Sequence, residues 1–392
     1  MIHILHLLGA ALGWLAIVVA TLGIIYCTAA AFIFRHYFAA ATPAPVRHDA
    51  VTLLKPLYGD EPRLYDNLAS FLAQDHAGPI QLLCGIQRAD DPAIAVVKAL
   101  KLAHPDADIQ LVVDGTVHGA SGKISNLVNM EPFIRHGIVV LSDSDIAVAP
   151  DYLGQLLRAL DRPNVGIVTC IYAGRGDAGF WSRLGAAGVS YQFMLGLVFG
   201  VANKLATPCM GSTIAMTRET LQRIGGFGSF ADKLADDYAI GEAVRALGLS
   251  IVLPPMLVDH AFDETSLSAL WHHELRWGAT VRDVAFWPYV GSIIGLPLPV
   301  AVLAMLYWPA AGLVLFALAA IVRLVVVRSV DATVGRRIAS LGLALAHDGM
   351  SFAIYIASFF VRSVDWRGAT LTMKTEGRIV AAHKIENAEQ RA

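Results

Sequence analysis

Long apolar runs stand at both ends of the chain, and shorter ones recur through its middle. Residues 7–34 read LLGAALGWLAIVVATLGIIYCTAAAFIF and carry no charge. As a helix this run would extend about 40 Å, enough to cross a ~30 Å hydrocarbon core with some tilt. It is too long for the apolar part of a signal peptide and no basic segment precedes it. We therefore predict a retained transmembrane anchor over residues 1–36.

Three further apolar runs lie near the other end, at residues 284–307, 309–327 and 338–361. They predict a C-terminal membrane region over residues 284–361, followed by a polar tail over residues 362–392. Arginines follow the anchor and also separate the last two runs (Arg35, Arg47, Arg328, Arg336 and Arg337). By the positive-inside rule, both places and the domain between them face the cytoplasm.

The side of the membrane on which the tail lies needs a further step. Three full crossings after the central domain would place the tail outside. Its basic residues favour the inside (Arg362, Arg367, Lys374, Arg378 and Lys384). One run is therefore expected to be re-entrant or interfacial. The run at 284–307, which contains Pro288, Pro297 and Pro299, is the candidate.

Residues 48–280 alternate short apolar runs with helical patterns. Five runs read as strands, and the stretches 63–74 and 92–103 read as helices between them. This alternation predicts an α/β domain with a mostly parallel sheet, in which ligands bind at the carboxyl ends of the strands. The apolar stretch 180–204 reads either as a core helix or as an interfacial helix that lines an acceptor channel.

Composition supports this division into a membrane part and a domain of ordinary character. Hydrophobic residues make up 56% of the 392 residues and charged residues 16%, against roughly 25% in soluble domains. The net charge of −2 gives no electrostatic footprint for nucleic acid. The cysteines are far apart and form no CxxC pair, so we expect reduced structural thiols (Cys27, Cys84, Cys170 and Cys209).

The pair Asp143 and Asp145 closes one of the predicted strands. Alternation at a strand end can point two carboxylates to one side, where they could hold a divalent ion and a diphosphate. Mg²⁺ and Mn²⁺ prefer such oxygen ligands. A solvated turn is the alternative. A second DxD match, Asp106 with Asp108, lies in a polar turn and is expected only to start a strand.

Two motifs stand at the starts of predicted helices. Asp91, in Asp90-Asp91-Pro92, suits the start of a helix, and its carboxylate could also meet the base or ribose of a nucleotide. Lys123 follows Gly122 in a turn that opens a helix, which suits a phosphate, although the spacing is not that of a P-loop. Helix capping is the alternative for this second motif.

Two more motifs come later in the central domain. Asp236 and Asp237 open a helix, where either could complement the helix dipole. One carboxylate would serve for that, so the second suggests a base that deprotonates an acceptor hydroxyl. The sequence HHELRW follows at 272–277. Its Arg276 can hold a phosphate and its Trp277 favours a membrane interface, while an interfacial helix with anchors is the alternative.

His347 and Asp348 stand in the middle of the last apolar run. Ionisable groups at that depth are costly and usually face protein or a water-filled cavity. A buried structural pair, a contact with a lipid headgroup and a proton path are all open interpretations.

In their order along the chain, these motifs resemble the inverting glycosyltransferases of family 2 and, more closely, of family 21, the ceramide glucosyltransferases. The pattern D, D, D, (Q/R)xxRW is matched by Asp91, by Asp143 with Asp145, by Asp237 and by 273–277. His273 departs from it, since the family has Gln or Arg there. The stretches GSTIAMTRETLQRIGGF, LADDYAIG and HHELRW also resemble the bacterial hopanoid-biosynthesis glycosyltransferases.

This resemblance implies a GT-A fold with a mixed, mostly parallel sheet between terminal transmembrane helices. It implies a UDP-sugar donor, a nucleotide contact from Asp91, and a metal, Mg²⁺ or Mn²⁺, on Asp143 and Asp145. Asp237 would be the base, and Arg276 with Trp277 would hold diphosphate or acceptor. The acceptor would be a membrane lipid, either ceramide or bacteriohopanetetrol, which would receive glucose or N-acetylglucosamine at the bacterial inner membrane.

Two other functions remain open from the sequence. A processive polysaccharide synthase would need a continuous channel and usually more membrane spans. A non-enzymatic transporter built around His347 and Asp348 would leave the large α/β domain unexplained.

Overall fold

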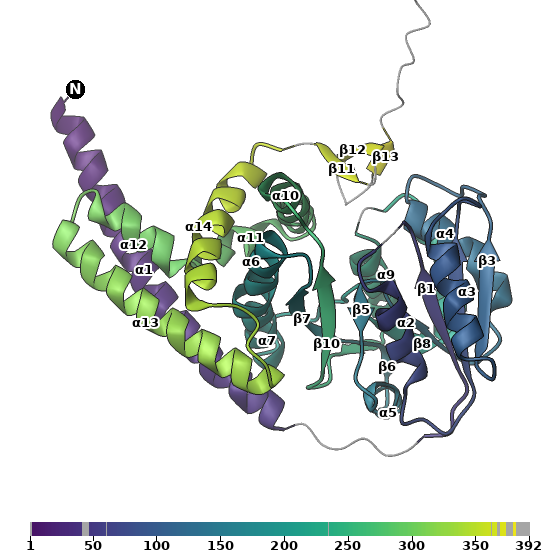
Figure 1. Cartoon of the computed structure of the whole chain (residues 1–392). Coiled ribbons are helices and arrows are strands. Elements are labelled where there is room, and N and C mark those ends of the chain that lie inside the picture. The colour runs from purple at the N-terminus through teal and green to yellow at the C-terminus, as the bar shows by residue number, and fades with distance from the viewer. Residues whose placement is uncertain are drawn as a thin grey trace, which may run out of the picture.

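The computed structural model describes residues 2–40, 47–59, 61–233 and 235–361, and three short strands at 363–366, 369–373 and 379–381. Figure 1 shows an α/β domain at one end and a group of long helices at the other. The second sheet and the helices α6 and α7 lie between these two parts.

The α/β domain is built on a seven-stranded sheet with the strand order β3-β2-β1-β4-β8-β6-β9. The first four strands along the chain pair in parallel: β1 (Val51–Pro56), β2 (Ile80–Ile86), β3 (Asp108–Val113) and β4 (Ile138–Leu141). Helices α2 (Leu64–Leu72), α3 (Ala93–Ala103) and α4 (Gly122–Met130) connect them. Strand β8 (Ile214–Thr217) runs antiparallel to both β4 and β6 (Val165–Thr169), and β6 pairs in parallel with β9 (Ser250–Val252).

This sheet confirms the predicted α/β class. Every residue of β1 is buried, as expected of a strand covered by helices on both faces. Asp108 begins β3, so the second DxD match only starts a strand, as predicted.

A smaller sheet joins β5 (Ile146–Ala147), β10 (Leu257–Phe262) and β7 (Ile171–Gly176) in the order β5-β10-β7. After β7 the chain continues into α6 (Phe180–Gly188), a π-helical turn at Val189–Phe193 and α7 (Met194–Ala202). Helix α5 (Tyr152–Leu160) and helix α8 (Arg218–Arg223) flank the main sheet, and α9 (Asp236–Ala246) precedes β9. Helix α10 (Leu267–Val284) leads into the C-terminal helices.

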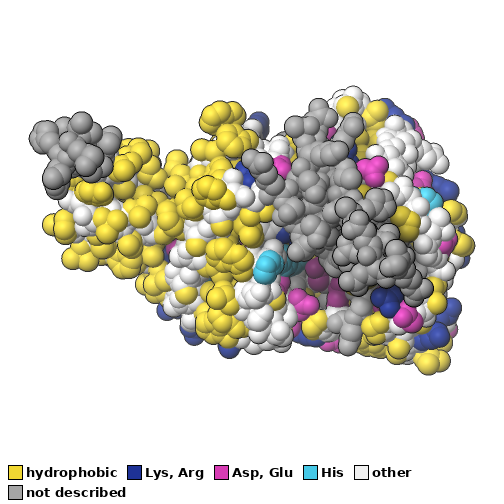
Figure 2. Space-filling model, turned by 90° about the horizontal axis from the view of Figure 1, so that it is seen from above, with side chains coloured by type: hydrophobic (Ala, Val, Ile, Leu, Met, Phe, Trp, Pro, Cys, Tyr) yellow, Lys and Arg dark blue, Asp and Glu magenta, His cyan; other side chains and the backbone are white. Residues whose placement is uncertain are grey.

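The helical end is formed by α1 (Ile2–Ala39), α11 (Phe286–Gly291), α12 (Pro297–Met305), α13 (Pro309–Val334) and α14 (Leu341–Ser358). Among the described residues, four stretches are long and apolar enough to cross a membrane: Gly9–Ala39, Phe180–Ala202, Pro309–Val334 and Leu341–Ser358. Figure 2 shows hydrophobic side chains covering this end of the molecule. Exposed residues such as Leu15 on α1 and Ile321 on α13 belong to that surface.

The proline-containing run breaks in the middle. Its two parts, Phe286–Gly295 and Pro297–Met305, meet at an angle of 71°, which fits either a broken span or a re-entrant loop. The loop after α12 lies beside the N-terminal half of α1, where Trp14 and Trp308 have ring centroids 5.1 Å apart. The other end of α1 contacts the α/β domain, because the Tyr37 hydroxyl donates a hydrogen bond to the Leu253 carbonyl.

Helix α14 follows a different course from α1 and α13. Figure 1 shows it running across them, beside α6 and α10. Just before it, the Ala339 amide donates to the Tyr191 hydroxyl, and just after it, the Val361 carbonyl accepts from the Arg282 guanidinium at the end of α10. Both ends of α14 therefore lie against segments that connect the α/β domain to the long helices, namely the π-helical turn and α10.

Part of the predicted polar tail forms a small antiparallel sheet of β11 (Ser363–Trp366), β12 (Ala369–Met373) and β13 (Ile379–Ala381). The basic residues that favour an inside tail lie outside the described residues (Arg362, Arg367, Lys374, Arg378 and Lys384).

Candidate active site

The Asp143-Ser144-Asp145 motif follows β4, the central strand of the large sheet. The Lys123 ammonium, from the first turn of α4, lies 2.7 Å from Oδ1 of Asp143 and 3.2 Å from Oδ2 of Asp236. Three segments that are distant in the sequence are thus joined by one cation. Four carboxylates, at positions 143, 145, 236 and 237, gather around this end of the sheet. We refer to them as the acid cluster.

Gly211 shows how close the members of the acid cluster lie. A Cβ atom added to this glycine would stand 3.2 Å from Oδ2 of Asp143, 3.5 Å from Oδ2 of Asp237 and 3.6 Å from the Lys123 ammonium. The Gly211 amide donates to Oδ2 of Asp237 at 3.0 Å, and the Tyr238 amide donates to its Oδ1 at 2.7 Å. The Asp237 carboxylate is therefore held by backbone amides at the start of α9.

Asp145 has a partner that the sequence did not suggest. Strand β10 pairs with β5, and this register places His260 opposite Ile146, directly after the motif. Nε2 of His260 lies 3.3 Å from Oδ2 of Asp145. Oδ1 of Asp145 and Nδ1 of His260 are buried and have no hydrogen-bond partner among the described residues. A lone histidine in an alternating strand gives no spacing signal, so only this long-range pairing reveals it.

Helix α10 brings part of the HHELRW motif to the same place. The rings of His273 and Trp277 have centroids 4.3 Å apart, and Trp277 lies 5.9 Å from His260. Nδ1 of His273 is hydrogen-bonded to the buried Glu264. His272 faces elsewhere and bonds to the Ser268 carbonyl, so the two adjacent histidines point apart, as expected.

Arg276 lies on the same helix, is half-buried and takes part in interactions of its own. Its role towards diphosphate or acceptor stays a prediction.

Lys55, which was not predicted from the sequence, is a buried lysine beneath the motif, and burial lowers its pKa to about 7. Its ammonium is fully buried, donates to the Ser142 hydroxyl at 3.1 Å and to the Asp143 carbonyl at 2.8 Å, and stands 3.5 Å over the Phe71 ring. It thereby fixes the backbone from which the Asp143 carboxylate projects. A lysine within the apolar strand VTLLKP was the available signal, because a fully buried lysine is rare unless it is paired.

The hydrogen bonds of Asp91 involve residues outside the acid cluster. Its carboxylate accepts from the amides of Gly59, at 3.0 Å, and Ala93, at 2.9 Å. It therefore ties the loop after β1 to the start of α3, which agrees with the helix-start interpretation. Its contact with a nucleotide stays a prediction.

His347 and Asp348 lie among the helices, each with a partner. The Arg323 guanidinium forms two hydrogen bonds to the Asp348 carboxylate, at 2.8 and 2.6 Å, and a third to the Tyr191 carbonyl at 2.9 Å. Nε2 of His347 lies 2.8 Å from Oε1 of Glu274 on α10. We call these five residues the Arg323 network. Its contacts support the structural interpretation of His347 and Asp348.

The charges of the acid cluster alter one another. Burial and the neighbouring Asp236 raise the pKa of Asp237 to about 6. Burial also raises the pKa of Asp143. For Asp145, the nearby His260, Lys55 and His273 together outweigh burial and lower the pKa to about 2. The Asp237 carboxylate is thus a candidate base near neutral pH, whereas the Asp145 carboxylate stays ionised at neutral and mildly acidic pH.

A divalent cation at the acid cluster stays a prediction. About a third of the side-chain surface of Asp143 and of Asp145 is exposed, and an oxygen of Asp145 has no protein partner. Carboxylate oxygens are ligands that Mg²⁺ and Mn²⁺ prefer. In the described part of the chain, however, no group of three or more His, Cys, Asp or Glu side chains is arranged to hold a metal ion. Asp143 and Asp145 therefore remain the predicted ligands.

The mixed, mostly parallel sheet has the topology of the GT-A fold. A solved structure with this fold is the mannosyltransferase from Pyrobaculum calidifontis in complex with GDP-Man and Mn²⁺. It aligns with a TM-score of 0.50 and 20% identity, over 86% of this chain and 99% of that one. The chain belongs to glycosyl transferase family 21, whose sequence model matches residues 14–379.

Among curated proteins, the chain is similar to two ceramide glucosyltransferases of Caenorhabditis elegans. Ceramide glucosyltransferase 1 is 25% identical over 248 residues, which are 63% of this chain, and ceramide glucosyltransferase 3 is 25% identical over 231 residues, or 58%. The matched region is about half the length of each relative, 49% in both cases.

Proposed function

We propose that this protein transfers glucose or N-acetylglucosamine from a UDP-sugar to a hydroxyl group of a membrane lipid, with inversion at the anomeric carbon. The observation that carries the proposal is the acid cluster, in which Asp237 lies next to the metal-binding candidates Asp143 and Asp145. The apolar helices beside this domain support a lipid acceptor. The basic residues Arg35 and Arg47 support a catalytic domain on the cytoplasmic side of a bacterial inner membrane.

The donor would bind at the carboxyl end of β4. A metal ion bound there would neutralise charge that develops on the leaving diphosphate. Lys123 can supply a second positive charge, because its ammonium already lies against Asp143. Lys55 holds the Asp143 backbone in place, so the carboxylate needs no rearrangement to meet the donor.

Asp237 is the proposed base. Its carboxylate is fixed by the amides of Gly211 and Tyr238, and its raised pKa of about 6 is suited to accepting a proton near neutral pH. As the acceptor oxygen attacks the anomeric carbon, its proton passes to Asp237 and the bond to UDP breaks. A single displacement turns an α-linked donor into a β-glycoside.

The acceptor would approach along α10 and α6. Trp277 contacts both His260, beside the acid cluster, and His273 on the same helix, and α10 and α6 both pack against α14. Bacteriohopanetetrol and ceramide both present a hydroxyl at the headgroup level. The resemblance of the GSTIAMTRETLQRIGGF stretch to hopanoid-biosynthesis enzymes favours the hopanoid.

The test is a transfer assay with the full chain in membranes. UDP-glucose or UDP-N-acetylglucosamine, each radiolabelled, is combined with ceramide or bacteriohopanetetrol, with and without EDTA. We expect EDTA-sensitive label in a single lipid, restored by added Mn²⁺ or Mg²⁺. A long polymer would point instead to a processive synthase. No label from any pair would overturn the proposal.

A further inference from the structure

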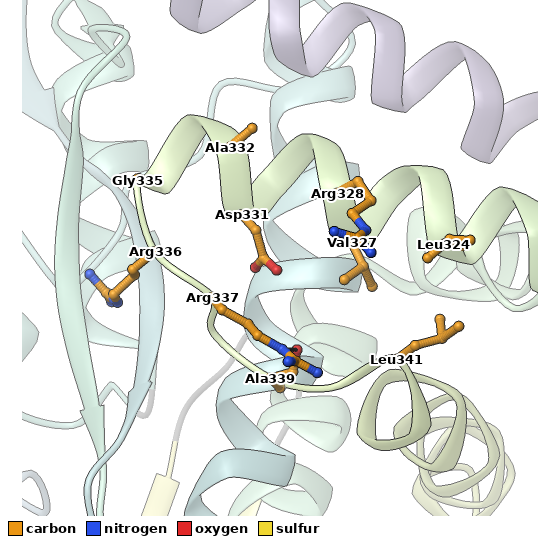
Figure 3. Close-up of a pocket in the computed structure, with 10 residues that line it drawn as sticks. All are labelled: Leu324, Val327, Arg328, Asp331, Ala332, Gly335, Arg336, Arg337, Ala339 and Leu341. Carbon is orange, nitrogen blue, oxygen red and sulfur yellow. Dashed lines mark hydrogen bonds between the residues drawn. The ribbon is translucent and has the colours of Figure 1, made fainter.

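A cavity of about 600 Å³ lies away from the acid cluster, where α13 ends and the segment 335–341 leads into α14. Figure 3 shows Arg328 and Arg337 reaching into the space between the helix and this segment. Leu324 and Leu341 line the cavity on the side of the apolar helices. The cavity has the size of a small-ligand site.

The side chains that line this cavity carry a net positive charge, and only part of it is balanced by ion pairs within the protein. Arg336 points away and pairs with Asp259 on β10, at 2.8 Å. Asp331 accepts from the Tyr191 hydroxyl at 2.7 Å and from the Ile338 amide at 3.1 Å.

Arg328 and Arg337 are exposed, and in the described part of the chain neither forms an ion pair. Arg337 makes one long hydrogen bond, of 3.5 Å, to the Ala339 carbonyl. Two guanidinium groups are therefore available to an anion in one cavity.

The position of the cavity, just beyond the apolar run of α13, indicates the kind of anion. The apolar run at 309–327 rises about 28 Å as a helix, close to the ~30 Å thickness of a hydrocarbon core. Arg323, within that run, is buried in its ion pair and does not face lipid. Arg328 is thus the first exposed charge after the run. In a bilayer crossed by that run, Arg328 would stand at the level of the lipid phosphates on the side of the α/β domain.

We propose that this cavity binds the phosphate group of an anionic glycerophospholipid. Arg328 and Arg337 hold the phosphate through charge-assisted hydrogen bonds, and the acyl chains leave past Leu324 and Leu341 into the bilayer. The bound lipid bridges α13 and α14 at the border of the α/β domain. The proposal depends on the membrane placement of α13 but not on the identity of the donor or the acceptor.

The test is a thermal-shift titration of the full chain purified in a non-ionic detergent. The probes are dioctanoylphosphatidylglycerol, dioctanoylphosphatidylcholine and inorganic phosphate. We expect saturable stabilisation by the anionic lipid. In the double variant Arg328→Gln/Arg337→Gln, its apparent Kd should rise about 30-fold, the loss expected for two guanidinium contacts. Arg328→Lys/Arg337→Lys keeps both charges and should retain an intermediate affinity.

The matched control is Arg218→Gln/Arg223→Gln, which removes two exposed arginines on α8 in the α/β domain. This variant should keep the wild-type affinity. A double variant at 328 and 337 that binds the anionic lipid as tightly as wild type would overturn the proposal. So would stabilisation by inorganic phosphate equal to that by the lipid, since the site would then serve a soluble anion. The readout is binding, so it is independent of sugar transfer.

Discussion

The acid cluster and the Arg323 network are both groups of ionisable side chains taken out of bulk water, but they balance charge differently. In the network, Arg323 meets Asp348 through two hydrogen bonds, and His347 meets Glu274 one to one. In the acid cluster, four carboxylates share Lys123 and His260. Oδ1 of Asp145 has no hydrogen-bond partner among the described residues.

The difference separates a structural contact from a binding site. A buried ion pair with all its hydrogen bonds made holds helices together and has nothing left to offer a ligand. An excess of carboxylates destabilises the folded protein through repulsion between like charges, unless a bound cation neutralises them. For Asp237 the sign is clear: its pKa is raised on folding, so its ionised form opposes folding above about pH 6, and this cost disappears at lower pH. We therefore expect the two groups to respond to mutation in opposite ways.

The largest expected effect is on turnover. Asp237→Asn keeps the shape of the side chain but cannot accept the proton, so turnover should fall about 10²–10⁴-fold. UDP binding should stay close to wild type, and thermal stability at neutral pH should be equal or higher, because Asn removes a charge that opposes folding above about pH 6. The control is Asp66→Asn, an exposed carboxylate on α2 that pairs with Arg63. Normal sugar transfer by the Asp237 variant would remove the base from the proposed mechanism.

The next effect is on stability and belongs to the Arg323 network. Arg323→Met leaves the Asp348 carboxylate buried without its partner, which should cost about 3–5 kcal/mol of stability. Arg323→Met/Asp348→Leu should regain most of that loss. Asp143→Asn should be nearly neutral or stabilising in the absence of metal, since it removes one of several like charges. Thermal unfolding in detergent measures all three, and equal losses at 323 and 143 would contradict the comparison.

A smaller effect concerns pH. Turnover requires the ionised form of Asp237, so the rate should fall as pH drops through about 6. Asp236→Asn removes the neighbouring charge that contributes to the raised pKa, and should move this acid limb to lower pH. Initial rates between pH 5 and 8 would show it. An acid limb that does not move in the Asp236 variant would mean that another group titrates.

The smallest expected effect is a difference in cysteine labelling. It tests how the C-terminal helices are placed across the membrane. We propose that the bent α11–α12 segment crosses the membrane and that α14 lies along its cytoplasmic side, which would place the basic tail inside. Leu306 and Phe360 are both exposed, and the four native cysteines are buried. In intact vesicles, a membrane-impermeant maleimide should label Leu306→Cys and Phe360→Cys from opposite sides. Labelling from the same side would restore the re-entrant assignment of residues 284–307.

Most of the sheet could be predicted from the sequence, because strands buried on both faces appear in it as short continuous apolar runs. The DxD pair could be found for the same reason, since it follows such a run. Lys55 and His260 could not be found in this way. Each is a single residue whose neighbour, the Asp143 carbonyl or the Asp145 carboxylate, is set by strand pairing far along the chain.

The partners of His347 and Asp348 were hidden for a similar reason. Glu274 is 73 residues from His347, and Arg323 is 25 residues from Asp348. No local periodicity joins them, so the sequence left a structural pair and a functional site as equal alternatives. The contacts in the folded chain favour the structural pair.

The position of Arg323 also has a consequence for biogenesis. During synthesis the arginine emerges 25 residues before Asp348, and it enters the bilayer without its counter-ion. Tyr191, whose carbonyl also accepts from Arg323, was made 132 residues earlier. Gly295, whose carbonyl lies 3.5 Å from the same guanidinium, also precedes Arg323 in the chain. If Arg323 enters the bilayer before Asp348 is made, these two backbone carbonyls are the acceptors from earlier segments with which it can form hydrogen bonds.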